Sequence, residues 1–249
     1  MKIAKRQARI LREVQLHNRV LVNDLAAMLA VSPDTIRRDI IALDKAGKLK
    51  RVHGGARALG YQPYDYRGAD IYLREQKDII AGKALQYIES DQVILISGGT
   101  TNLELVRMLP GDLEATFFTP SLPVAMQLLE HPGLKVIMLG GELSAEAQVA
   151  VGVSTLNMLS EVRFDLCLLG TGYLHPGAGL TEVDWQVAQL KKAMIRASRK
   201  VISLAVAEKL NSVQRYKICQ VNEIDLLITD LEPDKDVLQP YRQAGLNVI

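Results

Sequence analysis

The sequence predicts an α/β chain in two parts, a small N-terminal winged helix-turn-helix and a larger, mostly parallel α/β domain. Three observations lead to this prediction. Residues 24–57 read as two short helices followed by a basic hairpin. From residue 92 onward, short apolar runs alternate with helix-like segments. Net charge divides the chain in the same way. Residues 1–57 are basic, with 13 Lys and Arg against 5 Asp and Glu, whereas residues 58–249 are acidic, with 17 Lys and Arg against 23 Asp and Glu.

The two helices carry explicit start and stop signals. Asn23 or Asp24 can cap the first helix, whose apolar residues are Leu25, Met28 and Leu29. The second helix is expected to begin with Ser32 as N-cap and Pro33 in its first turn, and to run to about Ala46. Its buried stripe recurs at i, i+4 and i+7 and comprises Ile36, Ile40 and Leu43. Gly47 then supplies a left-handed stop.

Exposed polar and basic side chains of the second helix and of the hairpin are the candidate DNA contacts. Such a helix enters the major groove, and a basic wing lies along the phosphate backbone. Thr35 and Arg38 are predicted groove contacts, and Arg37 is a predicted phosphate contact. The other candidates are Ser32, Lys48, Lys50, Arg51 and His53. Asp39 and Asp44 are expected to pair with cations inside the protein, because phosphate would repel them.

Each piece alone has a simpler interpretation, since a helix with two arginines is usually a solvated surface helix and a basic run beside Gly-Gly is usually a soluble hairpin. The ordered combination over one small domain favours duplex DNA. We therefore expect a DNA-binding domain over 3–58, with the helix-turn-helix at about 20–39 and double-stranded operator DNA as partner. One recognition helix gives too little specificity, so a homodimer or homotetramer is expected.

The 249 residues leave room for a linker over 59–78 and a second core over 79–249. No run of about 18 apolar residues and no cleavable leader occurs, which predicts a cytoplasmic protein with no membrane partner. Cys167 and Cys219 lack CxxC spacing and are expected to be reduced and structural. The four histidines are scattered, so neither a metal site nor a cofactor is expected.

Seven strands are expected in the second core, at 92–97, 115–119, 134–140, 164–170, 200–206, 225–230 and 246–249. Helices are expected between them at 102–109, 122–130, 153–159, 184–199 and 236–244. Continuous apolar strands joined by helices argue for a mostly parallel sheet that is covered on both faces.

Ligands bind at the carboxyl ends of such strands, so the loops there form the candidate site. The first loop reads SGGTT before a helix, where glycine permits close backbone approach and the helix N-terminus favours an anion. A Gly-Gly turn also has a purely steric interpretation, and the loop is neither a Walker motif nor GxGxxG. Glycine-rich loops at the other strand ends and a nearby lysine favour a pocket for a small anionic ligand. The candidate residues are Ser97, Gly98, Gly99, Thr100, Thr101, Gly141, Gly170, Thr171, Gly172 and Lys209.

Two groups of motifs carry a family resemblance. The stretches SPDTIRRD and LDKAGKLKRVHGGA resemble the DNA-binding domain of the DeoR family of bacterial transcriptional regulators. The stretches SGGTT, TPSLPVA, MLGGEL, FDLCLLGTGYL, GLTEVDWQVAQLKKAMI and AVAEKL resemble the sugar-sensor domain of the same family. The resemblance implies a fold related to ribose-5-phosphate isomerase and a phosphorylated sugar effector that alters operator binding.

The resemblance also implies roles for particular residues. Gly99, Thr100 and Thr101 would meet the phosphate, whereas Gly170 to Gly172 and Thr181 would shape the sugar site. Lys191 and Lys209 would be its cationic groups. The chain departs from the family pattern at several positions. It has Ser97 and Glu208 where family members usually have aspartate, and Pro120 where they have asparagine. The family also has acidic residues near the positions of Gln186 and Val187. These departures leave open an unusual sugar phosphate or a sensor that has lost its response.

Three functions therefore remain. A repressor of a carbohydrate-metabolism operon that responds to a phosphorylated sugar is favoured. A regulator blind to small molecules is the alternative. An isomerase-like enzyme is disfavoured, because a carboxylate base is missing at Ser97, Gln186 and Val187. A purely architectural DNA-binding protein would hardly need a large α/β domain with glycine-rich strand ends.

Overall fold

A computed structural model describes residues 3–17, 19–59 and 72–249. The chain divides into two compact units, residues 1–72 and 73–249, which we call the winged-helix unit and the α/β unit. The division falls inside the predicted linker 59–78, of which residues 60–71 lie outside the described residues. In the described parts, no helix is both long and apolar enough to cross a lipid bilayer.

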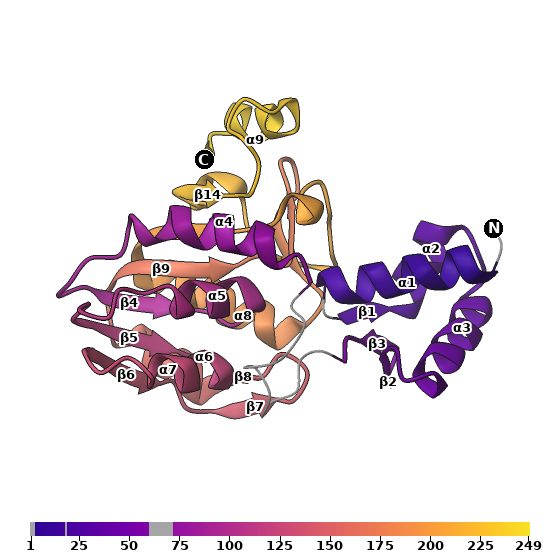
Figure 1. Cartoon of the computed structure of the whole chain (residues 1–249), viewed down its shortest axis with the longest axis horizontal. Helices are drawn as coiled ribbons and strands as arrows, with labels where there is room; N and C mark the ends of the chain where they lie inside the picture. The colour runs from indigo at the N-terminus through magenta and orange to yellow at the C-terminus, as the bar shows by residue number, and fades with distance from the viewer. Residues whose placement is uncertain (1–2, 18, 60–71) are drawn as a thin grey trace. The chain divides into compact units, whose positions relative to one another are not determined.

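The winged-helix unit packs three helices against a small antiparallel sheet (Figure 1). Its elements are α1 (Ile3–His17), β1 (Arg19–Leu21), α2 (Val22–Leu29), α3 (Pro33–Lys45), β2 (Lys50–Val52) and β3 (Gly55–Arg57). The strands lie in the order β1-β3-β2, and β2 and β3 form the predicted wing. The predicted stripe on α3 is confirmed, since Ile36, Ile40 and Leu43 are buried in one core with Ile10 and Val14 of α1.

The predicted boundaries of α3 are confirmed, and those of the preceding helix are not. The hydroxyl of Ser32 accepts a hydrogen bond from the Thr35 amide at 3.3 Å, and Gly47 has a φ of +65°. Helix α2 begins at Val22, with Leu21 at the N-cap and no side-chain cap, so the expected cap at Asn23 or Asp24 is wrong. The last residue of β1, Leu21, is extended at the N-cap position, but its apolar side chain cannot accept a hydrogen bond.

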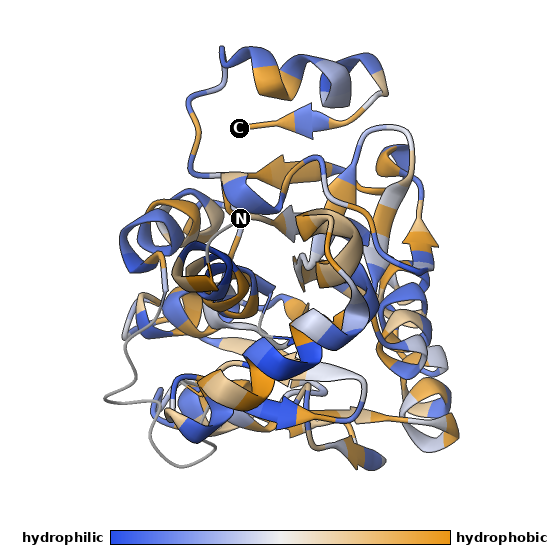
Figure 2. Cartoon of the chain, turned by 90° about the vertical axis from the view of Figure 1, so that its right-hand side faces the viewer, coloured by the Kyte–Doolittle hydropathy of each residue, from blue (hydrophilic) through white to orange (hydrophobic). Residues whose placement is uncertain are grey.

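A seven-stranded sheet forms the centre of the α/β unit, in the order β15-β14-β12-β9-β4-β5-β6. All neighbouring strands are parallel, so the predicted mostly parallel sheet is confirmed. The strands are β4 (Val93–Ile96), β5 (Ala115–Thr119), β6 (Leu134–Met138), β9 (Phe164–Gly170), β12 (Ser198–Leu204), β14 (Leu226–Ile228) and β15 (Asn247–Val248). Each coincides with a predicted apolar run. Hydrophobic residues are concentrated in these strands (Figure 2).

Helices cover the sheet in two groups. The first group is α4 (Arg74–Leu85), α5 (Thr100–Arg107) and α6 (Leu122–Leu128), in which α5 contacts both neighbours. The second group is α7 (Val153–Ser160) and α8 (Trp185–Ala197), which contact each other. At the C-terminal end, the 3-10 turn η3 (Asp236–Leu238) leads into α9 (Gln239–Gln243). Helix α4 was not predicted, because its first residues were assigned to the linker.

Short elements that the sequence pattern did not reveal lie between the main strands. One hairpin pairs β7 (Glu142–Ser144) with β8 (Val149–Val151). A second antiparallel sheet contains β10 (Tyr173–His175), β11 (Gly179–Glu182) and β13 (Tyr216–Cys219). The 3-10 turns η1 (Ala207–Lys209) and η2 (Val221–Glu223) flank β13 in sequence. Cys167 and Cys219 are free and buried, and burial raises the pKa of both thiols to about 12.

Candidate functional sites

One face of α3 presents the side chains that were predicted to meet DNA. Arg37 and Arg38 are exposed, and Thr35 is partly exposed. The hydroxyls of Ser32 and Thr35 lie 2.9 Å apart, so both side chains contribute to the helix start. Arg37 forms an ion pair with Asp34 on the solvent side, whereas Arg38 has no ion pair with any described residue.

The wing is basic and is held to α3 by its backbone. Lys48, Lys50, Arg51 and His53 are all exposed. The Arg51 amide donates a hydrogen bond to the Asp44 carboxylate at 3.0 Å, so Asp44 fixes the wing through a backbone group rather than through the expected cation. The side chain of Arg51 therefore stays outward.

Asp39 has the structural role that was expected for it. This buried carboxylate on α3 pairs with Arg6 of α1 and accepts a hydrogen bond from the Gln7 side chain at 3.1 Å. The pair ties the recognition helix to α1. The acidic group is thus neutralised and turned away from the exposed face that carries Arg38.

The predicted anion cradle lies between β4 and α5, at the carboxyl edge of the sheet. Gly99 is the N-cap of α5 with a φ of +116°, a conformation that glycine adopts readily. An α-helix leaves its first amide groups without intrahelical partners, and no side chain caps those of α5. Thr100 is partly exposed beside them, whereas Thr101 is buried. The loop therefore offers amide donors and a hydroxyl to an anion.

Ser97 joins two strand-end loops instead of opening onto the cradle. Its hydroxyl accepts a hydrogen bond from the Gly170 amide at 2.7 Å, and Asn102 donates to its carbonyl oxygen at 2.8 Å. A Cβ added at Gly170 would lie 2.5 Å from the Gly98 carbonyl oxygen. The loops after β4 and β9 are thus in direct contact, and glycine at 170 is required by that contact.

A serine that the sequence analysis did not single out lies beside the cradle. Ser121 follows β5 and is fully buried, and among the described residues its hydroxyl has no hydrogen-bond partner. A Cβ added at Gly98 would lie 3.1 Å from that hydroxyl oxygen. The signal that could have found it is its position directly after a predicted strand, in the TPSLPVA stretch.

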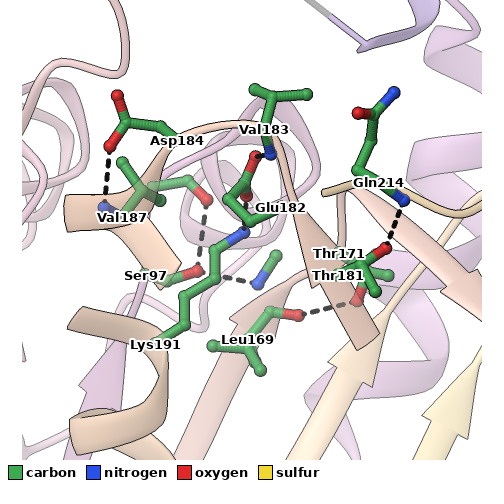
Figure 3. A network of polar contacts seen from close by, with 12 residues as sticks. Ser97, Leu169, Thr171, Thr181, Glu182, Val183, Asp184, Val187, Lys191 and Gln214 are labelled. Carbon is green, nitrogen blue, oxygen red and sulfur yellow. Dashed lines mark hydrogen bonds and ion pairs between the residues drawn. The ribbon is translucent and has the colours of Figure 1, made fainter. Parts of the chain in front are cut away.

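The threonines of the predicted sugar site are used inside the fold. The hydroxyl of Thr171 bonds that of Ser203. The hydroxyl of Thr181 accepts a hydrogen bond from the backbone amide of Gln214 at 2.8 Å (Figure 3). Gly172 lies beside Glu182, since a Cβ there would be 3.4 Å from the carboxylate. Gly141 lies apart from this group, and a Cβ there would meet the Thr155 hydroxyl at 2.2 Å and the Val151 carbonyl at 2.6 Å. Glycine is therefore required at position 141 because a larger residue would clash with these atoms.

Three lysines, which we call the lysine cluster (Lys77, Lys191 and Lys209), influence one another next to these loops. Lys209 donates a hydrogen bond to the Thr171 carbonyl at 3.1 Å. Lys191 forms an ion pair with Glu182 at 2.8 Å (Figure 3). Burial, together with the charges of Lys77 and Lys191, lowers the pKa of Lys209 to about 7, although Glu182 opposes this effect. The three lysines therefore outnumber the two carboxylates, Glu182 and Glu104, that act on them.

Lys77 was missed because it falls in the segment that was assigned to the linker. It is 6% exposed and shares the buried face of α4 with Ile80, Ala81 and Ala84. Burial lowers its pKa to about 8, and Glu104 opposes this effect. A lysine among apolar residues at i, i+3, i+4 and i+7 is the sequence signal that could have found it.

The structure corrects the premise that no carboxylate lies beside a lysine of the candidate site. A carboxylate does lie beside a lysine, since Glu182 contacts Lys191, although none occurs at Ser97, Gln186 or Val187. Both oxygens of Glu182 are engaged, one by Lys191 and the other by the Val183 amide at 2.9 Å. These two contacts occupy Glu182 within the fold.

A basic winged helix-turn-helix followed by an α/β unit with an anion-favouring site defines a DNA-binding regulator. The model of the DeoR-like helix-turn-helix domain matches residues 6–61, and that of the DeoR C terminal sensor domain matches residues 73–231. The chain belongs to the DeoR family of transcriptional regulators.

Its relatives extend over the whole chain. The HTH-type transcriptional regulator GolR of Listeria innocua is 30% identical over 246 residues, covering 98% of this chain and 97% of that protein. GlpR of Haloferax volcanii is 31% identical over 249 residues (99% and 97%), and the glycerol-3-phosphate regulon repressor of Escherichia coli K12 is 28% identical over 242 residues (96% and 95%). A solved D-ribose-5-phosphate isomerase is similar with a TM-score of 0.42 and 20% identity, over 56% of this chain and 55% of that chain.

Proposed function

We propose that this regulator represses a carbohydrate-metabolism operon and that a phosphorylated sugar releases it from its operator. The observation that carries the proposal is the lysine cluster. Three lysines share a site with few carboxylates, and the pKa values of Lys77 and Lys209 are lowered to about 8 and about 7. Positive charges crowded together in a poorly solvated site repel one another, and a bound anion relieves that repulsion. A sugar phosphate supplies that anion and the hydroxyls that a polar pocket can read.

The cradle at Gly99, Thr100 and Thr101 supplies the second half of the phosphate site. A helix N-terminus favours a phosphate through its free amides and its dipole. The contact between Ser97 and Gly170, followed by that between Thr171 and Lys209, joins the cradle to the lysine cluster. We assign the sugar to the region of Gly172, Thr181 and Lys191. The relative named as the glycerol-3-phosphate regulon repressor is consistent with this ligand class.

The DNA contacts are assigned to α3 and the wing. Thr35 and Arg38 would read base edges, and Arg37, Lys48, Lys50, Arg51 and His53 would bind phosphates, with Ser32 at the helix start. We propose residues 3–58 as the DNA-binding domain, 59–78 as the linker and 79–249 as the sensor. We also propose a cytoplasmic homodimer or homotetramer without enzymatic activity, since both oxygens of Glu182 are engaged.

Titrating the operator with the full-length protein tests the proposal. An operator fragment is first selected from random duplexes and then titrated at fixed salt, with and without each member of a panel of sugar phosphates. The correct effector is expected to lower operator affinity by roughly 5- to 150-fold, and operator is expected to lower effector affinity by the same factor. A sugar phosphate that raises the melting temperature yet leaves the operator curve unchanged would favour the regulator that is blind to small molecules.

A further inference from the structure

The first turn of α4 connects the candidate effector site to the point where the chain enters the α/β unit. Leu73 is the N-cap of α4 and has a φ of 56° and a ψ of 46°, a left-handed conformation that is uncommon for leucine. Its carbonyl oxygen accepts a hydrogen bond from the Lys77 amide at 3.1 Å. The division between the two units falls immediately before Leu73.

Glu104 of α5 is the acidic partner of this turn. It is 2% exposed. One of its oxygens accepts a hydrogen bond from Arg107 at 2.6 Å, and the other lies 3.8 Å from Arg74. The same carboxylate opposes the lowering of the pKa of Lys77. Glu104 thus interacts with two cations of the first turn of α4, Arg74 and Lys77, as well as with Arg107 of its own helix.

Lys77 also belongs to the lysine cluster, because its charge contributes to the lowered pKa of Lys209. It therefore lies within electrostatic reach of both Glu104 and the proposed phosphate site. Glu104 is one turn along α5 from the cradle residues Thr100 and Thr101. A dianion among the lysines would compete with Glu104 for the ammonium of Lys77, since opposite charges at short range in a buried site interact strongly.

We propose that Lys77, Glu104 and Arg74 form a relay that couples the effector site to the DNA-binding unit, which rests on the proposed function above. Bound phosphate draws Lys77 toward itself, and Glu104 then interacts more strongly with Arg74. Because Arg74 and Lys77 are in one helical turn, this exchange changes the geometry of the turn that follows Leu73. Glu104 is a positioning residue, since it acts through Lys77 and Arg74 and touches no ligand.

The coupling between phosphate and operator is the quantity to measure. The probe is inorganic phosphate, with chloride at the same ionic strength as reference, and the full-length protein is used. Phosphate affinity is measured by calorimetry for the free protein and for its operator complex, and the ratio of the two dissociation constants is the coupling. This ratio does not change when a substitution weakens phosphate binding equally in both states.

Glu104→Gln and Arg74→Gln are the test variants, and Glu75→Gln is the matched control. Glu75 is exposed on the same turn of α4, so its variant keeps the coupling of the wild type. A wild-type coupling of at least fivefold is expected, falling below twofold in both test variants. Arg74 has an exposed side chain, so its variant tests the relay even where Glu104→Gln fails to fold.

Each failure has its own signature. Wild-type protein that binds phosphate without any coupling would overturn the proposed function, and the relay with it. Wild-type coupling that persists in Arg74→Gln and Glu104→Gln would overturn the relay alone. Loss of coupling in Glu75→Gln as well would also overturn the relay, because any change in the charge of α4 would then abolish the coupling.

Discussion

Replacing Lys209 by Met is expected to stabilise the ligand-free protein while weakening its affinity for anions. Met keeps much of the length of the side chain and removes the charge. Each pKa unit corresponds to about 1.4 kcal/mol, so lowering the pKa of Lys209 from 10.5 to about 7 corresponds to about 5 kcal/mol. Lys209 is partly exposed, so solvent screening reduces this figure. Loss of the hydrogen bond to Thr171 lowers the expected gain in the free energy of unfolding by about 1 kcal/mol more. We expect a net gain of about 2 kcal/mol.

The pH dependence identifies the cause. Below about pH 7, Lys209 is protonated in both the folded and the unfolded chain, and the folded state bears the whole penalty. Between about pH 7 and pH 10.5 the unfolded chain binds more protons than the folded chain. The free energy of unfolding of the wild type therefore rises with pH in this range. The advantage of Lys209→Met is therefore largest below pH 7 and disappears near pH 10.5. In the variant, the free energy of unfolding still rises with pH because of Lys77, whose pKa is about 8 in the folded protein.

Urea unfolding followed by tryptophan fluorescence is the assay. Trp185 is the only tryptophan in the chain and starts α8, so its signal reports on the α/β unit. Midpoints are measured from pH 6 to pH 10 for both proteins without phosphate in the buffer. A variant that is less stable than the wild type at pH 6.5, with an unchanged pH profile, would refute the reasoning, because the charge of Lys209 would then not be a source of instability.

Three further predictions follow from contacts described above. Arg38→Ala is expected to weaken operator binding by about 1 to 3 kcal/mol, and an equal loss on random duplex would show that Arg38 reads no base. Ser97→Ala leaves the Gly170 amide without its acceptor and is expected to lower the free energy of unfolding by about 1 to 3 kcal/mol, which an unchanged urea midpoint would contradict. Asp39→Ala removes the carboxylate that pairs with Arg6 and accepts from Gln7, and is expected to lower the melting temperature of the winged-helix unit, whereas an unaltered melting curve would count against the pair as a link between α1 and α3.

Strong local signals explain which elements could be predicted. The Ser32 and Pro33 pair defines the start of α3 because both residues act through adjacent backbone groups. The seven parallel strands are apolar on both faces, so each appears as a continuous run. Helix α4 gives a weaker pattern, since Lys77 occupies a position where its neighbours on the same face are apolar. Packing of α4 against α5 brings the charge of Glu104 to bear on that lysine, which the local sequence does not reveal.

The candidate site could be predicted to the level of loops but not of individual side chains. The rule that ligands bind at the carboxyl ends of strands locates the 97–101 loop correctly at that edge. It does not reveal that the Ser97 hydroxyl bonds Gly170, or that Thr155 packs against Gly141. Those contacts join residues that are 73 and 14 positions apart, so no local pattern contains them.

The crowding of cations in the lysine cluster also bears on how long each copy of the regulator survives. By linkage, an anion that binds only the folded state at a hundred times its dissociation constant adds about 2.7 kcal/mol to stability. Cellular proteases act mainly on unfolded chains, so ligand-free copies would be degraded first. Effector supply would then set the abundance of the regulator as well as its occupancy of DNA, and a pulse-chase comparison of Lys209→Met with wild type would separate the two.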